Sequence, residues 1–377
     1  NKILNVPNLR FPEFEGEWQE KRLSDIADLS KGIGISKDQL SADGEPCILY
    51  GELYTKYKSE TIKEVISKTN IDNTKLVKSK ANDVIIPCSG ETAEEIATAR
   101  CVLKDDVLLG GDLNIIRLHG YDGSFMSYQL NGKRKYDIAK VAQGVSVVHL
   151  YGEHLKNIKT INPGLNEQKK IANLLSLLDE RISTQNKIIE KLESLIKGIR
   201  NDVFGKLRKS VGFNAMIGDV LSYEQPQSYL VEDTEYTNEG TPVLTANKAF
   251  VLGYTSEIEG IYDKGDCIIF DDFTLDCKYV DFSFKVKSSA IKILTAKNKE
   301  LLRYTFEFLK YLDLSTEEHK RHYITETQNQ EFILPTVQII RTIAHAFYAL
   351  SLWKETIVKQ RYAFEKQKQY LLRQMFI

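Results

Sequence analysis

The segment that decides the fold runs from Pro163 to Phe204 and reads PGLNEQKKIANLLSLLDERISTQNKIIEKLESLIKGIRNDVF. Between Asn166, a suitable N-cap, and Gly198 it contains neither glycine nor proline, which predicts one long helix. Its apolar residues recur alternately every four and three positions, as in a coiled-coil seam. The seam positions are Ile171, Leu175, Leu178, Ile182, Gln185, Ile189, Leu192, Ile196, Ile199 and Val203. Gln185, the polar exception, either fixes the helix register or occupies a solvent-tolerant position.

The same pattern recurs at the end of the sequence, where Pro335 corresponds to Pro163 and Ile343 to Ile171. Half of this second seam is apolar and consists of Ile343, Leu350, Ile357, Phe364 and Leu371. The other half contains three cations and reads Phe347, Lys354, Arg361, Lys368 and Met375. We expect the stems of these cations to cover apolar surface while their charged heads reach water. Because a lone helix would expose its apolar face, the two helices are predicted to pack as an antiparallel coiled coil.

Each helix follows a region of short β-like runs broken by Gly, Asn and Asp. The first region contains the runs 47–50, 83–87 and 114–118, the second contains 242–244 and 265–270, and each adds a helical stretch at 124–140 or 299–312. The chain is therefore an internal duplication with an α+β fold, in which two mixed α/β domains are each followed by a long helix. The predicted boundaries are 1–162 for the first domain, 163–205 for its helix, 206–334 for the second domain and 335–377 for the last helix.

Composition limits the class of protein. The 377 residues are 42% hydrophobic, which is enough for two cores, and no apolar run approaches the roughly 18 residues of a membrane span. The start, Asn1 to Pro7, lacks the apolar core of a signal peptide. Five scattered cysteines without a Cys-x-x-Cys pair argue for reduced thiols and against a disulfide frame or a zinc site. We expect a soluble, cytoplasmic protein.

The sequence resembles the specificity subunit of type I restriction–modification enzymes. Its opening, Val6 to Phe14 followed by Gly16-Glu17-Trp18, looks like the start of that family. The junction with the first long helix is also similar, and the matching residues are Gly144, Val145, Ser146, Leu155, Ile158, Pro163, Glu167, Gln168, Ile171, Leu178, Asp179 and Ile182. The second junction departs from the family, because Ile339-Ile340 replace Glu167-Gln168 and no glycine corresponds to Gly144.

The resemblance implies two target-recognition domains, each reading one half of a bipartite double-stranded DNA site. It also implies helices that hold the domains apart and dock two methyltransferase subunits, with restriction/translocase subunits in the same complex. By this resemblance the chain is non-catalytic and directs DNA methylation and restriction by its partners. No cofactor is expected on this chain, whereas S-adenosylmethionine, ATP and Mg²⁺ are expected on the partner subunits.

Helix length and charge both affect how the chain could bind DNA. From Ile171 to Val203 a helix rises about 50 Å, against ~34 Å for one turn of B-DNA, so helix length would set the spacer between half-sites. Charge is less favourable, because residues 1–162 hold 22 Lys+Arg against 23 Asp+Glu, and residues 206–334 hold 15 against 21. Since DNA affinity depends on neutralising phosphates, we expect the chain alone to bind DNA weakly and its partners to supply phosphate contacts.

Several polar clusters are candidates for contact with bases or phosphates. Two are basic and aromatic, at Lys133-Arg134-Lys135-Tyr136 and at Lys320-Arg321-His322-Tyr323, and a solvated helix face or loop is the alternative for both. Two are loops of the first domain, at Ser89-Gly90-Glu91-Thr92 and at Gln143 with Ser146. The last is acidic, at Asp271, Asp272 and Thr274, where an aspartate can accept from the cytosine amino group and a turn-forming role is the alternative.

Two other classes of function stay open. Asp266 or Asp271 with Asp276-Cys277-Lys278 is a weak match to a metal-dependent nuclease, in which carboxylates hold Mg²⁺. A coiled-coil scaffold whose domains bind protein would suit the acidic second domain. Methyltransferase and ATPase motifs are missing, because Asn162-Pro163-Gly164 lacks the second proline and the aromatic residue of an amino-methylating site and no Gly-x-x-x-x-Gly-Lys-Ser/Thr occurs. No metal site is predicted from the six histidines.

Overall fold

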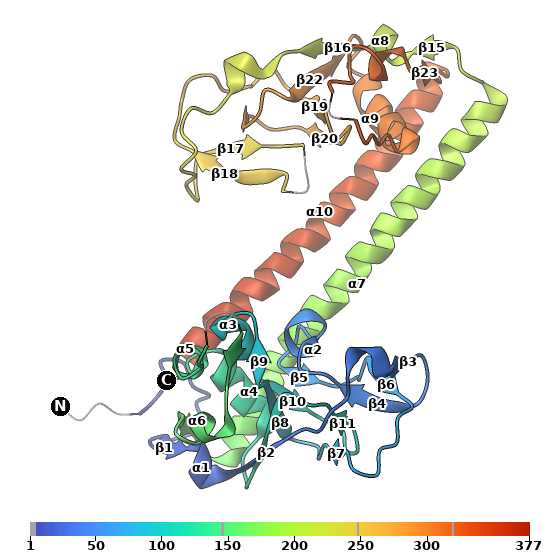
Figure 1. Cartoon of the computed structure of the whole chain (residues 1–377). Coiled ribbons are helices and arrows are strands. Elements are labelled where there is room, and N and C mark those ends of the chain that lie inside the picture. The colour runs from blue at the N-terminus through green and yellow to red at the C-terminus, as the bar shows by residue number, and fades with distance from the viewer. Residues whose placement is uncertain (1–4, 145–146, 247–248, 319) are drawn as a thin grey trace. The chain divides into compact units, whose positions relative to one another are not determined.

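The computed structural model describes residues 5–144, 147–246, 249–318 and 320–377 and divides into two compact units. The first unit comprises 1–186 and 359–377, and the second comprises 187–358, so each long helix contributes to both. These helices are α7 (Leu165–Ser210) and α10 (Val337–Gln374), labelled in Figure 1. Within the described residues, no helix is long and apolar enough to cross a membrane.

The end of α7 lies beyond the boundary predicted at residue 205. Gly205 is an ordinary position inside the helix, and no atom lies within 4 Å of the Cβ that would be added there. The helix ends where Gly212 takes a left-handed φ of +75° and donates its amide to the Leu207 carbonyl, as a glycine C-cap does. The sequence therefore offers Gly205 and Gly212 as possible ends of the helix, and the helix ends at Gly212, which has the capping geometry.

The first domain contains, among its described residues, two five-stranded sheets. One has the order β2 (Ala27–Lys31), β12 (Leu113–Leu118), β8 (Asp83–Pro87), β10 (Arg100–Val102), β5 (Thr61–Ile62). The other has the order β3 (Leu40–Ser41), β6 (Ser67–Thr69), β4 (Glu45–Ile48), β11 (Leu108–Leu109), β7 (Val77–Lys78). Strand β8 is buried along its whole length because α4 (Gly123–Asn131) packs on it and on β10.

Shorter elements complete this domain. The helices are α1 (Leu23–Ile26), α2 (Glu52–Thr55), α3 (Ala93–Ile96), α5 (Lys135–Lys140) and α6 (Gly152–Lys156). Strand β1 (Gln19–Arg22) pairs antiparallel with β14 (Lys159–Asn162), immediately before α7 begins. The core next to α7 also includes the end of the chain, since Phe376 stacks on Phe125 with ring centroids 5.1 Å apart, and Leu371 and Met375 join the same cluster.

The second domain repeats this plan with fewer described strands. A four-stranded sheet has the order β16 (Leu221–Glu224), β22 (Ile291–Ala296), β19 (Cys267–Asp271), β20 (Cys277–Val280). A three-stranded sheet has the order β18 (Val251–Thr255), β17 (Thr241–Leu244), β21 (Lys285–Val286). Helix α9 (Leu301–Leu312) packs on β19, β20 and β22, α8 (Ile217–Val220) precedes β16, and β15 (Ala215–Met216) pairs with β23 (Glu331–Phe332).

The duplication predicted from the sequence is confirmed strand by strand. Ala27 pairs with Leu118 in the first domain, and Leu221 pairs with Ala296 at the same place in the second. The order β2-β12-β8 recurs as β16-β22-β19, again with antiparallel neighbours. The Leu23 amide donates to the Ile158 carbonyl, and the Ile217 amide donates to the Gln330 carbonyl. The two domains therefore share one topology.

Inside each unit the two long helices are antiparallel neighbours. In the first unit Lys368 bonds to Asp179, and Arg361 bonds to Asn186 at 3.2 Å. In the second unit Lys354 pairs with Glu193 at 2.6 Å, and the guanidinium of Arg200 lies 5.6 Å from the centre of the Phe347 ring. In these four pairs the α7 residue number increases by seven while the α10 number decreases by seven, so the heptad register of the antiparallel coiled coil is continuous within each unit.

The charged heads of all three seam cations were expected to reach water, and this is wrong for Lys368. Lys354 and Arg361 keep 38% and 34% of their side chains exposed, but Lys368 is only 12% exposed. Its ammonium turns inward because Asp179 and Glu60 hold it at 2.6 Å each. The charged head of Lys368 therefore lies in the interior of the first unit and does not reach water.

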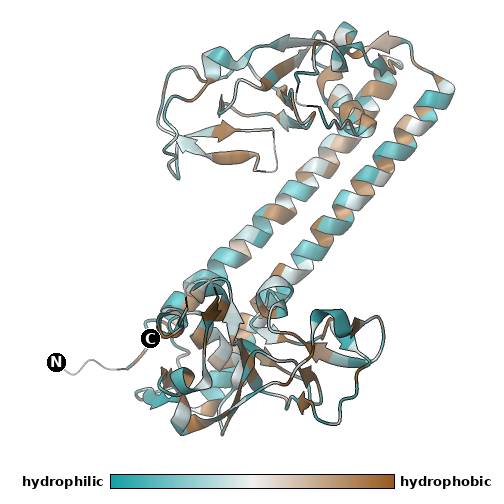
Figure 2. Ribbon diagram, in the orientation of Figure 1, coloured by the Kyte–Doolittle hydropathy of each residue, from teal (hydrophilic) through white to brown (hydrophobic). Residues whose placement is uncertain are grey.

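The remaining seam positions have the burial expected of a two-helix seam, and Figure 2 shows apolar and polar residues alternating along both helices. Among the predicted seam residues, Leu178 and Ile357 are buried, and Ile182, Gln185, Ile189, Leu350 and Phe364 are partly buried. The side-chain oxygen of Gln185 is buried without a hydrogen-bond partner among the described residues. Within the part of the chain that the structure describes, that oxygen therefore makes no bond that could fix the helix register.

Candidate DNA interface

Four of the five polar clusters predicted from the sequence meet in pairs, one pair at an edge of each domain. In the first domain Cys88 follows β8, and its carbonyl accepts from the Leu150 amide at 2.7 Å. In the second domain Asp272 follows β19, and its carbonyl accepts from the His322 amide at 3.1 Å. These are corresponding bonds of the duplication. They bring 89–92 next to 143–151 in one domain, and 271–274 next to 320–323 in the other.

We call these regions the loop edges. In the first domain the loop edge comprises 31–34, 89–92, 110–112, 143 and 148–151, and in the second it comprises 225–228, 271–274 and 320–323. Strand β9 (Ser89–Gly90) pairs with β13 (Val148–His149), and Gln143 bridges to His149 from the other side. Of the predicted contacts here, Glu91, Thr92 and Gln143 are exposed, Gly90 is partly buried and Ser89 is buried. Ser146 lies outside the described residues.

Close backbone contacts shape the first loop edge. A Cβ on Gly32 would collide with the Gly110 carbonyl and lie 2.7 Å from the Leu109 carbonyl. A Cβ on Gly111 would lie 3.3 Å from the Cα of Gly34. Asp112 has a left-handed φ of +58° and accepts the Ser89 hydroxyl at 3.1 Å. Glycine is thus required where two backbone segments touch, and it leaves backbone groups close to the surface.

An aromatic and basic cluster lies on the same edge. Tyr151, 45% exposed, stacks with His149 at 6.0 Å between ring centroids and contacts His154 edge-on at 5.6 Å. The Lys31 ammonium lies 5.6 Å from the centre of the Tyr151 ring. Lys31 and Tyr151 also line a cavity of about 300 Å³, together with Leu29, Ser30, Asn114, Gly152, Glu153 and Lys156. Asn114 holds the wall in place by donating its amide to the Leu150 carbonyl at 2.9 Å.

Lys31, His149 and Tyr151 were not predicted from the sequence, although the internal repeat contained a signal for His149 and Tyr151. The long helices repeat with an offset of 172 residues, as in Pro163 and Pro335. Applying that offset places the predicted cluster Lys320–Tyr323 on Val148–Tyr151 of the first domain. The corresponding backbone bonds of Leu150 and His322 confirm this alignment. The duplication therefore identifies the first cluster once the second is known.

The second loop edge is built around a buried ion pair. Lys292 and Asp272 lie 3.2 Å apart, and each side chain is 1% exposed. The other oxygen of Asp272 accepts the backbone amides of His322 and Tyr323 at 3.0 and 2.7 Å. Lys292 also donates to the Gln225 side chain at 2.9 Å. Because a buried charge must be paired and hydrogen-bonded, this arrangement ties 271–274 firmly to 320–323.

Burial changes the roles of four predicted contacts. Asp271, Asp272, His322 and Tyr323 are all buried, so their side chains position the second loop edge and do not face solvent. Asp271 closes a turn by accepting the amides of Phe273 and Thr274, both at 2.9 Å, which is the turn-forming alternative. Lys320 is exposed but paired with Glu318 and Glu326 at 2.6 and 2.8 Å. Arg321 and Thr274 are exposed and stay predicted contacts.

His322 carries the clearest titration effect at this edge. Its Nδ1 lies 2.8 Å from a Glu326 oxygen, and this hydrogen bond raises the pKa of His322 above its ordinary value. The pKa of Glu326 is lowered by its bonds to Lys320 and His322. The charged form of each group is therefore favoured in the folded protein.

The remaining predicted cluster lies at the junction of α4 and α5 and is not among the residues of the loop edge. Lys133 is exposed and Lys135 partly buried. Arg134 is 18% exposed, pairs with Asp137 at 3.5 Å and donates to the Ile377 carbonyl at 3.2 Å. Arg134 thus fixes local structure, while contact of Lys133 and Lys135 with DNA stays a prediction.

The acidic residues considered for a nuclease are occupied by other partners. Asp276 pairs with Lys278 at 3.0 Å and with Lys310 at 2.6 Å, and these bonds outweigh burial and lower its pKa. Asp266 accepts the Tyr279 hydroxyl at 2.7 Å. Among the described residues, no group of three or more His, Cys, Asp or Glu side chains could hold a metal ion. Asp276 is thus a lysine partner in this structure.

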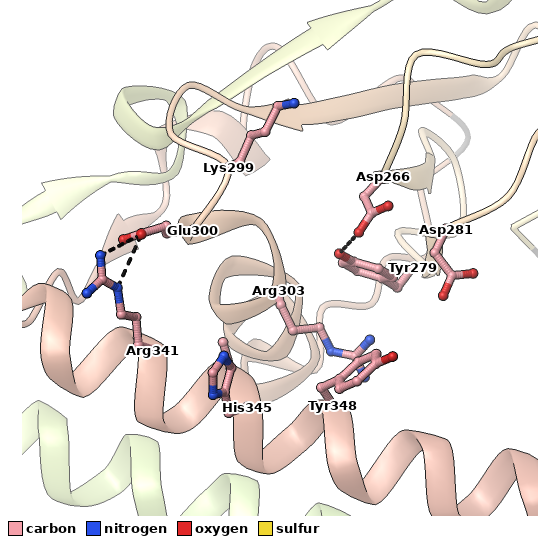
Figure 3. A pocket seen from close by; sticks show the side chains of 10 residues that line it. Asp266, Tyr279, Asp281, Lys299, Glu300, Arg303, Arg341, His345 and Tyr348 are labelled. Carbon is pink, nitrogen blue, oxygen red and sulfur yellow. Dashed lines mark hydrogen bonds and ion pairs between the residues drawn. The ribbon is translucent and has the colours of Figure 1, made fainter.

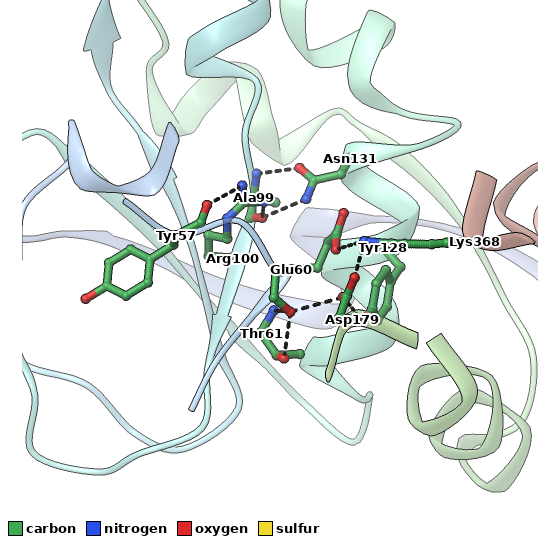
Figure 4. A network of polar contacts seen from close by, with 10 residues as sticks. Tyr57, Glu60, Thr61, Ala99, Arg100, Tyr128, Asn131, Asp179 and Lys368 are labelled. Carbon is green, nitrogen blue, oxygen red and sulfur yellow. Dashed lines mark hydrogen bonds and ion pairs between the residues drawn. The ribbon is translucent and has the colours of Figure 1, made fainter. Parts of the chain in front are cut away.

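A buried polar network ties the first domain to the long helices (Figure 4). Asp179 of α7 accepts from Lys368 and from the Tyr128 hydroxyl, at 2.6 and 2.7 Å, and Lys368 also donates to Glu60. Burial raises the pKa of Glu60, and the two carboxylates raise the pKa of Lys368 despite its burial. In the second unit Arg200 of α7 pairs with Glu307 of α9 at 2.7 Å. Each domain is thus anchored to α7 by a charged side chain.

Parts of this chain are similar in sequence to known proteins. The sequence profile of the type I restriction modification DNA specificity domain matches residues 15–194. Over 126 residues the chain is 45% identical to the type I restriction enzyme EcoR124I/EcoR124II specificity subunit of Escherichia coli, covering 32% of this chain and 31% of that protein. Over 199 residues it is 30% identical to the MjaVIII specificity subunit of Methanocaldococcus jannaschii, covering 52% and 44%. The matches thus span less than half the length of these curated relatives.

A solved structure extends the likeness to the whole fold. The crystal structure of the type I restriction–modification S subunit from M. genitalium superposes with a TM-score of 0.69 and covers 99% of both chains at 17% identity. At that identity the superposition establishes the fold, including the two domains and the two long helices. Residues 15–194 are therefore similar to the type I restriction modification DNA specificity domain, and the chain shares its fold with that S-subunit structure.

Proposed function

We propose that this chain is the non-catalytic specificity subunit of a type I restriction–modification complex and reads an asymmetric, bipartite DNA site. The observation that carries the proposal is the pair of loop edges, which occupy the same place in both domains but present different side chains. The first exposes Tyr151 beside Lys31, whereas the second buries Tyr323 and has Gln225 at the position of Lys31. Unlike edges on one scaffold suit two unlike half-sites.

Exposed apolar side chains on α10 support the proposal of protein partners. In the second unit Tyr348, Leu352 and Trp353 are each more than half exposed, and Tyr348 lines a cavity of about 490 Å³. Figure 3 shows this cavity, with Arg303 of α9 and His345 of α10 also in its wall. In the first unit Tyr362 and Tyr370 are 56% and 58% exposed. Such surfaces are typical of protein interaction sites, and we assign them to two methyltransferase subunits.

The complex then divides its chemistry between subunits. S-adenosylmethionine, ATP and Mg²⁺ bind to the methyltransferase and restriction/translocase partners, and this chain binds none of them. The partners also supply phosphate contacts that the acidic second domain lacks. Helix length as a spacer ruler stays a prediction, for which a four-residue insertion beside Gln185 that left the spacer unchanged would be contrary evidence.

Methylation mapping tests the proposed function. The chain is combined with its methyltransferase subunits and S-adenosylmethionine, and methylated adenines are mapped on a DNA library. Two defined half-sites at a fixed spacing are expected, and exchanging 89–92 for an unrelated loop should alter one of them. A stable complex that leaves all DNA unmethylated would favour the scaffold function instead. DNA cleavage by the chain alone with Mg²⁺, lost in Asp276→Ala, would favour the nuclease.

A further inference from the structure

We propose that Lys31 and Tyr151 form a phosphate-contact site for the DNA backbone, present in the first domain and lost from the second. The inference rests on the proposed function and goes further, because it assigns a sequence-independent contact to named residues. The two residues belong to the first loop edge, beside the strands β9 and β13. They are therefore placed to hold a DNA strand whose bases face 89–92.

The charge of Lys31 is not neutralised within the protein. Its side chain is exposed, and it makes no ion pair among the described residues, whereas nearby Lys156 is paired with Glu153 at 2.6 Å. The contact of Lys31 is the face of the Tyr151 ring, which orients the ammonium without cancelling its charge. A cation held in this way is available to a phosphate.

Tyr151 adds a rigid support for the Lys31 ammonium and a hydroxyl that can donate a hydrogen bond to a phosphate. Its ring is stacked on His149 and met edge-on by His154, so its position is fixed although it is 45% exposed. Its hydroxyl has no hydrogen bond among the described residues. Phenol hydroxyls and lysine ammonium groups are common donors to DNA phosphates. Glu91 is exposed on the same edge, but a carboxylate suits a cytosine amino group, so phosphate binding falls to the cation.

The duplication supplies an internal comparison. Gln225 stands in the second domain where Lys31 stands in the first, because each lies four residues after the corresponding strand residues Ala27 and Leu221, which pair with Leu118 and Ala296. Its amide oxygen accepts from the buried Lys292. Tyr323, at the place of Tyr151, is 1% exposed and packs edge-on against Phe270 at 5.5 Å. The second domain therefore has neither the cation nor the exposed phenol.

Binding measurements with the full chain and its methyltransferase subunits test the site. The DNAs are a labelled duplex carrying the mapped site and one with the first half-site scrambled, titrated between roughly 50 and 200 mM salt. The variants are Lys31→Met, Tyr151→Ala and a control, Lys104→Met. Lys104 is exposed in the turn that follows β10, at the opposite end of the sheet, where Val102 pairs with Asp83 at the start of β8.

The expected loss of affinity does not depend on the DNA sequence. Lys31→Met should weaken binding about three- to tenfold on both duplexes and reduce the slope of log K against log salt by about 0.9, while Lys104→Met leaves both unchanged. Tyr151→Ala should weaken both duplexes in the same direction. Wild-type slopes in Lys31→Met, or a loss confined to the cognate duplex, would overturn the phosphate site and leave the proposed function intact. Failure of the wild-type complex to select any site would overturn both.

Discussion

Lys368 of α10 and Asp179 of α7 form an ion pair of 2.6 Å in the interior of the first unit, with side chains 12% and 8% exposed. The pair joins the two long helices, and Glu60 of the first domain shares the same ammonium. A single lysine thus pairs with two carboxylates from segments far apart in the sequence.

Removing that lysine should destabilise the first unit. Lys368→Met keeps the apolar stem but leaves Asp179 and Glu60 buried without their cation, which costs about 3–5 kcal/mol. Urea unfolding followed by circular dichroism measures the loss. Lys366→Met is the matched control, because Lys366 is exposed on the same helix and should change stability by no more than about 0.5 kcal/mol. Equal stabilities of the two variants would contradict the role given to Lys368.

The Gly-x-Gly segment of the first loop edge allows a second matched pair. In Gly32→Ala the new methyl collides with the Gly110 carbonyl, and we expect a loss of about 1–3 kcal/mol. Gly34→Ala meets no atom within 4 Å and should stay within about 0.5 kcal/mol of wild type. Thermal unfolding distinguishes the two. If both variants melt with the wild type, the backbone contact does not constrain this edge.

The buried ion pair of the second loop edge should behave as a coupled unit. Lys292→Met alone leaves the Asp272 carboxylate uncompensated and should cost about 3–5 kcal/mol. Adding Asp272→Asn removes the charge while its oxygen still accepts the amides of His322 and Tyr323, so the double variant should recover part of the loss. A double-mutant cycle measured by urea unfolding gives the coupling energy. Strict additivity would show that the two charges act independently.

The pH dependence of the second unit should follow His322. Because its folded pKa is raised above 6.5, protonated His322 stabilises the fold at lower pH, and this contribution is lost as pH rises through the folded pKa. The melting temperature of the wild type should therefore exceed that of His322→Gln at about pH 5.5, and the difference should shrink towards about pH 8. His345→Gln, at an exposed histidine of α10, serves as the control. A difference that grows with pH would contradict the assigned sign.

The sequence predicted features that depend on local pattern and missed those that depend on which strands meet. The seam spacing from Ile171 to Val203 was sufficient to predict α7, and the offset of Pro335 from Pro163 predicted the duplication. No local pattern distinguishes Tyr151 from Tyr323, because their difference in exposure arises from packing against Phe270 and from the salt bridge beneath the loop. Likewise, Lys368 and Lys354 occupy equivalent heptad positions of the second seam, so the sequence pattern does not distinguish them. Only the contacts of Lys368 with Asp179 and Glu60 turn its side chain inward.

The first unit is also interrupted in sequence, since residues 187–358 are inserted between its two parts. Phe376 and Leu371, which complete the cluster around Trp18 and Phe125, are translated only after the whole second unit. The first unit therefore cannot complete this cluster until the segment that follows the second unit has been synthesised. Until then, Trp18 and Phe125 lack part of the apolar cover that Leu371 and Phe376 provide. A chain truncated before these residues therefore exposes an apolar surface on the first unit.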